Sequence, residues 1–386
     1  MTLDEPEHIR LLRDATRRFV DQHMPRDAAK KWDKENIFPR EVYAELGKMG
    51  VMGLTVPTEY GGQGVDIPAT MAVIEELGKR SSAVVCPYIM AACYAGMNLV
   101  ESGSESQKRA FLPKVANGEF MFAYGLSEPN VGGDLAMVET TARREGNRIL
   151  VNGTKRWCTG AHIADYIFCL ARTGPKEERY KNLTILLIPP KAKGVTIRPL
   201  DHLGIRGVET NDAIFEDVEI GEDAILGGAQ MWNQGWRQLA GRALEVEKLE
   251  LSAVALGLAE AAIADAIEYA ETRIQFGKPI GQHQAIRHTI AEVKTKALAM
   301  RLMLGHAAAL VQARKPSATE SSMTKLFCCE GAAEITLACQ RVMGAYGLSD
   351  LTDMVRYVRD AISLPIVGGS SNIQKNNIAN RLKLAE

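Results

Sequence analysis

The chain has 386 residues, of which 46% are hydrophobic and 24% are charged, and its formal net charge is −1. This composition is ordinary for a globular protein, and the length allows two or three domains with a large core. Because basic residues are spread along the chain and balanced by acidic ones, binding to nucleic acid or to an anionic membrane surface is not expected.

Seven cysteines are scattered along the sequence without a CxxC pair, and the histidines lie far from them. This pattern predicts reduced thiols in a reducing compartment such as the cytoplasm, and it disfavours a metal site. The acidic start, 1–7, leads directly into a helical pattern, which argues against a signal peptide or an Arg-rich transit sequence.

Segment 81–100 carries no charge, so a membrane-spanning helix has to be weighed against a buried one. Pro87, Asn98 and several small residues favour the buried helix, and we therefore predict no membrane span.

The spacing of apolar residues divides the chain into three blocks. Residues 9–20 and 42–49 have the three- and four-residue spacing of helices, and loop chemistry follows at 57–64. From about Phe122 the pattern changes, and from Trp232 the helical spacing returns. Between these points, short β-rich runs surround a turn expected at 152–153 and occupy 148–151, 166–170, 183–188 and 213–218.

We therefore predict a multidomain α+β protein. It should have an N-terminal α-helical domain over 1–120, a middle β-barrel-like domain over 121–230 and a C-terminal four-helix bundle over 231–386. Because neither helical block can obviously bury all its apolar surface alone, the bundle is expected to pack against partner subunits.

Segment 273–284 combines a helix end, a cation, an aromatic residue and a sharp Gly–Lys–Pro turn before a new helix. The Arg273 guanidinium could recognise a phosphate through two parallel hydrogen bonds. For the motif alone, a capped helix–turn–helix with a solvated Arg273 is the simpler interpretation.

Four segments, 56–64, 124–134, 153–159 and 273–284, stand in an order and spacing that resemble the acyl-CoA dehydrogenase family of flavoproteins over essentially the whole chain. One departure is that the family usually has Gly–Ser–Asp where this chain has Gly132, Gly133 and Asp134. There is no GxGxxG after a strand, so a Rossmann dinucleotide site is not indicated.

The resemblance implies FAD between the β-domain and the C-terminal helices. Ser127, Trp157 and Thr159 would face the isoalloxazine ring, although Trp157 could equally be a core residue. A neighbouring subunit would hold the diphosphate and adenine with Arg273, Phe276, His283 and Gln284, although His283 could be an ordinary helix-start histidine. The other positions expected to bind the cofactor are Tyr124, Leu126, Gly132, Gly133, Ser370 and Asn372.

The expected base is displaced from its usual position. Most of the family places a Glu near the C-terminus, where this chain has Gly368. A minority, as in isovaleryl-CoA and long-chain acyl-CoA dehydrogenases, places it on the long helix, where this chain has Glu247. We predict Glu247 as the base, with Glu250 on the same helical face as the reserve candidate. The alternative is that Glu245, Glu247 and Glu250 are solvated surface charges.

The substrate side is also given by the resemblance. The Gly368 N–H could still polarise the thioester carbonyl, and the missing side chain could leave room for a branched or cyclic acyl group. Lys248 stands where an Arg often binds the CoA arm, and Arg341 and Ala345 depart from the family pattern at the adenine end. The remaining positions expected to bind substrate are Glu245, Gly369, Met90 and Tyr94, with Cys86 beside the last two on the uncharged helix over 85–97.

The implied reaction is FAD-dependent α,β-dehydrogenation of an acyl-CoA to the trans-2-enoyl-CoA, with Glu247 removing the α-proton and hydride passing to flavin. An electron-transfer flavoprotein is the expected electron acceptor, and a homotetramer built as a dimer of dimers is the expected assembly. Three alternatives stay open: an enoyl-CoA reductase, a flavin oxidase or monooxygenase, and a non-catalytic flavoprotein subunit.

Overall fold

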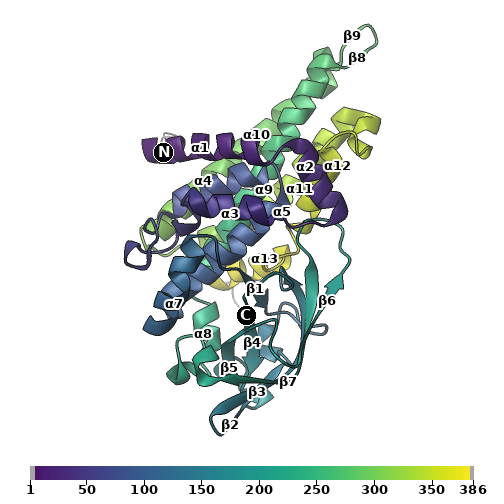
Figure 1. Ribbon diagram of the computed structural model, residues 1–386. Helices are drawn as coiled ribbons and strands as arrows, with labels where there is room; N and C mark the ends of the chain where they lie inside the picture. Colours follow the sequence, from purple (N-terminus) through teal and green to yellow (C-terminus); the bar gives the residue numbers. More distant parts are fainter. Residues whose placement is uncertain (1–4, 383–386) are drawn as a thin grey trace.

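The computed structural model describes residues 5–382, which form a helical N-terminal region, a curled β-sheet and a C-terminal helical bundle (Figure 1). The predicted fold class is thereby confirmed. The part of the N-terminal expectation that concerns residues 1–4 lies outside the described residues.

The N-terminal region is a layer of helices around the apolar helix α4, almost all of which is buried. The two predicted helices correspond to α1 and α3. The helices are α1 (Glu7–His23), α2 (Arg26–Glu35), α3 (Arg40–Lys48), α4 (Ile67–Gly78), α5 (Ser82–Tyr88), α6 (Gly96–Ser102) and α7 (Glu105–Ala116).

The uncharged segment is helical throughout but not regular. A π-helical stretch, Ile89–Ala95, separates α5 from α6, and the Thr55 hydroxyl donates a hydrogen bond to the carbonyl of Ala92 within it. Ser82–Ser102 is long and apolar enough to cross a membrane, yet 83% of its most apolar window is buried inside the molecule. Burial of this extent is typical of a core helix, as the sequence predicted.

The middle region is one curled seven-stranded sheet in which β1, β4, β2, β3, β7 and β6 are neighbours in that order and β5 pairs with β4. All four predicted runs lie within strands. The strands are β1 (Phe122–Gly125), β2 (Thr141–Glu145), β3 (Arg148–Thr159), β4 (Tyr166–Arg172), β5 (Leu183–Ile188), β6 (Val195–Leu200) and β7 (Thr210–Gly221).

The prediction of a turn at 152–153 is wrong. Strand β3 continues through these residues, and its pairing with β7 shifts register between Val151 and Gly153. Gly153 has a φ of 143°, and a Cβ there would lie 2.5 Å from the Thr140 hydroxyl oxygen. The Asn–Gly pair therefore provides the close approach of a β-bulge instead of a chain reversal.

The C-terminal region is built on the long helices α9, α10 and α11, and its loop between α9 and α10 is a small hairpin at the far tip of the bundle (Figure 1). The elements are α8 (Gly235–Leu239), α9 (Arg242–Thr272), β8 (Ile274–Gln275), β9 (Lys278–Pro279), α10 (Gln284–Gln312), α11 (Ala318–Met343), α12 (Met354–Ser363) and α13 (Ser371–Arg381).

Helix α9 is the element that joins the regions, because it packs against α4, α10, α11, α12 and the π-helical stretch. Its contact with α4 is close: a Cβ on Gly257 would lie only 2.4 Å from the carbonyl oxygen of Glu75. Glycine permits this backbone approach, which fixes the N-terminal half of α9 over the π-helical stretch.

Candidate active site

The carboxylate of Glu247 lies beside Gly368. A Cβ built on Gly368 would stand 3.3 Å from Glu247 Oε1 and 2.1 Å from Leu251 Cδ1. Gly368 has a φ of +59°, in the left-handed region that favours glycine. Two segments distant in the sequence thus bring the α9 carboxylate to the position from which a side chain at 368 would project.

The expectation that Gly368 leaves room for a branched or cyclic acyl group stays a prediction, but the space next to the Gly368 Cα is filled. Leu251 Cδ1 and the Glu247 carboxylate already occupy the space that a side chain on Gly368 would enter. A close-packed interior fills such a vacancy, and here the α9 side chains do so.

Glu247 is partly exposed at the molecular surface but surrounded by protein on most sides. Burial raises the pKa of the Glu247 carboxyl to about 6, against the opposing effects of the Tyr94 hydroxyl and the Lys248 and Lys325 ammonium groups. Lys325 is itself buried, and its Nζ donates to the Leu364 carbonyl at 3.0 Å. A carboxyl with this pKa can exchange a proton near neutral pH.

The two flanking glutamates have different surroundings. Glu245 accepts hydrogen bonds from Lys248 Nζ at 3.0 and 3.1 Å, and Lys248 is only 3% exposed. Lys248 is therefore occupied by an ion pair on its own helix, not open toward a CoA arm. Glu250 is 0% exposed, so the interpretation of this run as solvated surface charge does not apply to it.

Two tyrosines line the same region. The rings of Tyr94 and Tyr124 meet edge to face with centroids 5.0 Å apart, and the Asn98 amide donates to the Tyr124 hydroxyl. Met90 Cε is 3.6 Å from where a Cβ on Gly160 would stand, directly after Thr159 of β3. Met90 and Tyr94 both belong to the π-helical stretch, and their contact with substrate stays a prediction.

Trp157 is 57% exposed and has a φ of 67°, which is unusual for a residue other than glycine. It stands in the irregular stretch of β3 between Lys155 and Cys158, which turns its indole outward. The alternative that Trp157 is a core residue is therefore wrong. Exposed aromatics held in strained backbone often mark a binding surface.

A buried ion pair holds the loop beside Trp157 against the sheet. Lys155 Nζ donates to Glu128 Oε1 at 2.8 Å and to the Leu126 carbonyl at 3.0 Å, and both charged side chains are almost fully buried. Burial opposes ionisation of Glu128, but Lys155 outweighs it and lowers the pKa of Glu128. The loop that carries Ser127 is thereby fixed.

The other expected cofactor positions surround this surface. The Ser127 carbonyl accepts from the Arg156 N–H at 2.9 Å, and the Thr159 and Thr210 hydroxyl oxygens are 3.0 Å apart. Gly132 and Gly133 are exposed, and a Cβ on Gly133 would lie 2.9 Å from Ile373 Cδ1 of α13. On that helix Ser370 is the N-cap, Asn372 is exposed, and the Gly369 carbonyl accepts from Gln374 at 2.9 Å.

Arg273, Phe276, His283 and Gln284 lie together at the hairpin tip, remote from the β-sheet of the same chain (Figure 1). Phe276 is 94% exposed and meets the His283 ring edge to face at 6.0 Å. His283 is the N-cap of α10, but its side chain makes no capping bond, and its Nε2 lies 3.3 Å from the Gln275 carbonyl oxygen. The structure does not bring these residues to Glu247 within one chain.

Sequence reasoning missed two residues near the carboxylates and one beside Tyr124. Cys93, Asn98 and Lys325 were not expected at the site. Asn98 offered the one signal, because an amide in an otherwise apolar helix requires a polar partner.

Three family models cover most of the chain. The descriptions are acyl-CoA dehydrogenase N-terminal domain for residues 6–119, middle domain for 123–218 and C-terminal domain for 233–383.

Similar proteins agree with these matches. The chain is 34% identical to the 3-(aryl)acrylate reductase of Clostridium sporogenes over 97% of this chain and 98% of that one. It is 31% identical to an acyl-CoA dehydrogenase of Bacillus subtilis, covering 95% of each. The solved glutaryl-CoA dehydrogenase in complex with glutaryl-CoA is 31% identical, with a TM-score of 0.94 over 100% of this chain and 98% of that one. The chain therefore belongs to the acyl-CoA dehydrogenase family of FAD-dependent oxidoreductases.

Proposed function

We propose that the protein oxidises an acyl-CoA thioester to the trans-2-enoyl-CoA with Glu247 as the base that removes the α-proton. The observation that carries the proposal is the approach of the Glu247 carboxylate to the Gly368 position, where most of the family attaches its base. The carboxylate thus reaches the same place from a different element.

The residues around Glu247 suit this role. Burial gives it a pKa of about 6, so it is ionised at neutral pH and still basic enough to accept a proton. Tyr94 of the π-helical stretch and Lys325 of α11 both favour the ionised form of Glu247. They offset part of the effect of burial, so the pKa of Glu247 stays near neutral pH. The Gly368 N–H is the donor we assign to the thioester oxygen, where negative charge develops as the α-proton leaves.

The surface residues fit FAD. The exposed Trp157 indole and the exposed loop at Gly132 and Gly133 offer a ring face and free backbone N–H groups. The tip residues Arg273 and Phe276 would hold the diphosphate and adenine of a neighbouring subunit's cofactor, in a homotetramer built as a dimer of dimers. Bound FAD supplies the acceptor for the hydride that leaves the β-carbon.

The direction of the reaction follows from the partner that is present. A residue that removes an α-proton in oxidation returns it in reduction, and the similarity to a 3-(aryl)acrylate reductase makes reduction of an enoyl thioester the second candidate. We favour oxidation, with an electron-transfer flavoprotein as acceptor and the cytoplasm as the compartment. The choice of electron acceptor and the choice of compartment do not rest on any residue beyond those named above.

The test is anaerobic mixing of the purified holoenzyme with a panel of straight, branched, cyclic and aryl acyl-CoA thioesters, followed by flavin absorbance. Bleaching by at least one thioester is expected, and Glu247→Gln should retain bound flavin yet lose bleaching by about 10³-fold, within the range for a general base. Glu268→Gln, an exposed glutamate on the same helix, is the matched control. A Glu247→Gln variant with near-normal bleaching would refute the assignment, and bleaching by reduced nicotinamide alone would favour the reductase.

A further inference from the structure

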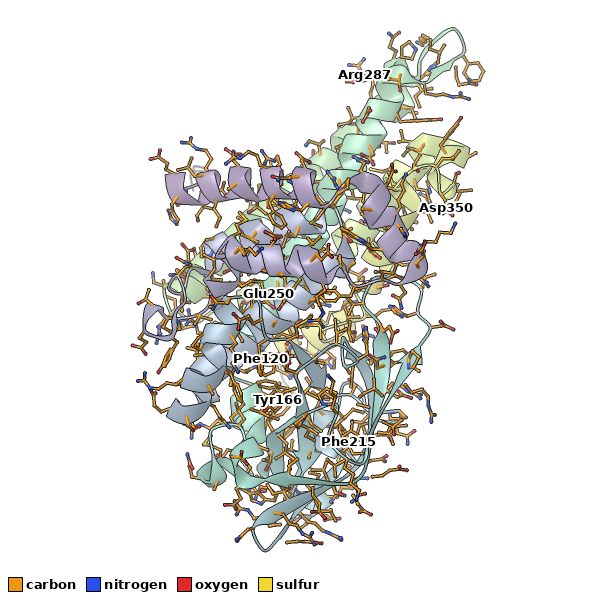
Figure 2. All side chains as sticks on the ribbon, viewed as in Figure 1. Phe120, Tyr166, Phe215, Glu250, Arg287 and Asp350 are labelled. Carbon is orange, nitrogen blue, oxygen red and sulfur yellow. The ribbon has the colours of Figure 1, made fainter. Side chains whose placement is uncertain are left out.

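Glu250 is a buried acid without an evident purpose. Its side chain is 0% exposed, and neither carboxyl oxygen has a hydrogen-bond partner among residues 5–382. It lies one turn of α9 beyond Glu247, and Figure 2 shows it inside the molecule, close to the boundary between the helices and the β-domain. An isolated buried carboxylate is strongly disfavoured, so a fold retains one only when it is neutral or used.

In the part of the chain that the structure describes, no cation compensates Glu250. The groups that face it are the Cys93 thiol of the π-helical stretch, the phenols of Tyr88, Tyr94 and Tyr124, and the Glu247 carboxylate. The two lysines of the site are directed elsewhere, because Lys248 pairs with Glu245 and Lys325 donates to the Leu364 carbonyl.

The proton of the pair therefore resides on Glu250. Burial raises the pKa of Glu250 well above its usual value, the Cys93 thiol opposes this, and the Glu247 charge adds to it. Two carboxyls on one helical face in a low dielectric cannot both ionise easily, so the pair carries one negative charge through neutral pH. Glu247, which is less buried and has Tyr94 and Lys325 nearby, keeps that charge.

A neutral carboxyl has an O–H that needs an acceptor. The Tyr88 hydroxyl already donates to the Val51 carbonyl at 3.0 Å, and no hydrogen bond of normal geometry joins Glu250 to Cys93. The charged acceptor one turn away is the Glu247 carboxylate, and a bond from a neutral acid to a carboxylate is among the stronger kinds.

We propose that Glu250 is a positioning residue for Glu247: a proton-bearing carboxyl that donates a hydrogen bond to the base and fixes its orientation. The inference rests on the proposed function, because it gives Glu250 a role only if Glu247 is the base. Glu247 and Glu250 are three residues apart on α9, so their side chains are neighbours on the same face of the helix. No net proton transfer is required of Glu250 during turnover.

Two variants of similar size separate positioning from packing. Glu250→Gln keeps an N–H donor in place of the O–H, whereas Glu250→Leu has none. In anaerobic flavin reduction by the most active acyl-CoA, Glu250→Leu should be slowed roughly tenfold or more, the effect of one charge-assisted bond. Its acid limb in the pH profile should move upward by about one unit, since the base loses a donor that favours its ionised form. Glu250→Gln should stay within about threefold of the wild type, with the limb unmoved.

Equal behaviour of the two variants would overturn the proposal, because a packing role predicts no rescue by the donor. A downward shift of the limb in Glu250→Gln would overturn it as well, since that result means the wild-type Glu250 is ionised and repels Glu247.

A second measurement needs no substrate and so separates this inference from the proposed function. An acid whose folded pKa is raised weakens the fold progressively as pH rises above its unfolded value of about 4.3. The Glu250→Gln holoenzyme should therefore gain thermal stability over the wild type, and the gain should grow between about pH 5 and pH 8. A constant or absent gain contradicts a buried proton-bearing Glu250. If the gain appears while no thioester bleaches the wild-type flavin, the proposed function is wrong, but the inference that Glu250 carries a proton still holds.

Discussion

Two pairs of glutamates, one buried on α4 and one partly buried on α9, have opposite surroundings. Glu75 and Glu76 of α4 are each 2% exposed and are surrounded by cations. Arg301 holds both Glu75 oxygens at 2.7 and 3.0 Å, and Arg13 reaches Glu75 at 2.9 Å and Glu76 at 3.0 Å. Among residues 5–382, Glu247 and Glu250 of α9 have no such partners: Lys248 and Lys325 only favour the ionised form of Glu247, and no cation acts on Glu250.

The comparison shows that partners, not burial alone, decide what a buried carboxyl does. Burial opposes ionisation of Glu75, but Arg301 and Arg13 outweigh it and lower the pKa of Glu75 to about 2. Burial raises the pKa of Glu247 to about 6, because Tyr94, Lys248 and Lys325 oppose it only in part. The first pair is a permanently charged link between α1, α4 and α10, whereas the second can gain and lose protons near neutral pH.

The largest effect should come from making the same change in both pairs and measuring catalysis. Glu247→Gln is expected to slow substrate-dependent flavin reduction by about 10³-fold, because a general base is removed. Glu75→Gln should leave the rate per folded, flavin-loaded molecule within about threefold, because the α4 pair contacts no reacting group. Stopped-flow absorbance measures the rate of flavin reduction in both variants. Comparable losses of rate would contradict the difference in role between the two pairs.

Stability should respond in the opposite way. Glu75→Gln removes one carboxylate of the cluster around Arg13 and Arg301, which keep Glu5, Glu76 and Glu260 as partners. The free energy of unfolding should fall by about 2 kcal/mol, the contribution of hydrogen bonds to a charged group. Glu247→Gln should cost nothing measurable at pH 7, since it removes a charge that burial disfavours. Denaturant titration of the holoenzyme gives both values, and a Glu247→Gln variant as destabilised as Glu75→Gln would contradict this account.

Acidification should separate activity from folding. Below about pH 6 Glu247 gains a proton, and kcat/KM should drop about tenfold per pH unit. Glu75 has a folded pKa below its unfolded value, so its contribution to stability is present above about pH 5 and is lost as pH falls toward about 2. A folded, inactive enzyme is therefore expected near pH 4.5, detectable by circular dichroism beside the assay. Simultaneous loss of both signals would argue that a structural group controls activity.

The smallest effect concerns a single hydroxyl. Tyr94 favours the ionised form of Glu247, so Tyr94→Phe should move the acid limb of the activity profile upward by roughly half to one pH unit. Tyr60→Phe, which removes a hydroxyl that contacts Glu105 on a distant helix, is the matched control and should not move the limb. An unchanged limb in Tyr94→Phe would exclude the tyrosine from the site.

Much of the site was predictable because its determinants are local. The reversal after α9 and the irregular strand at Trp157 follow from short runs of residues, and apolar spacing identified the long helices. The resemblance to the minority of the family with a base on the long helix gave the prediction of a base on α9 within the run Glu245, Glu247 and Glu250. The sequence of this run could not reveal that Lys248 forms an ion pair with Glu245. Which partner Lys248 takes depends on the groups that folding brings near it.

By itself the sequence determined the helix–strand–helix order, the family and the absence of a glutamate at 368, since periodicity and residue identity are properties of the chain. Only the tertiary structure decided that the α9 carboxylate meets Gly368, that Leu251 fills the space there and that no cation of residues 5–382 lies beside Glu250. These outcomes depend on how α9, the π-helical stretch and the segment before α13 pack together. Burial and the distances between charges exist only after that packing, and they determine the proton affinity of a carboxyl.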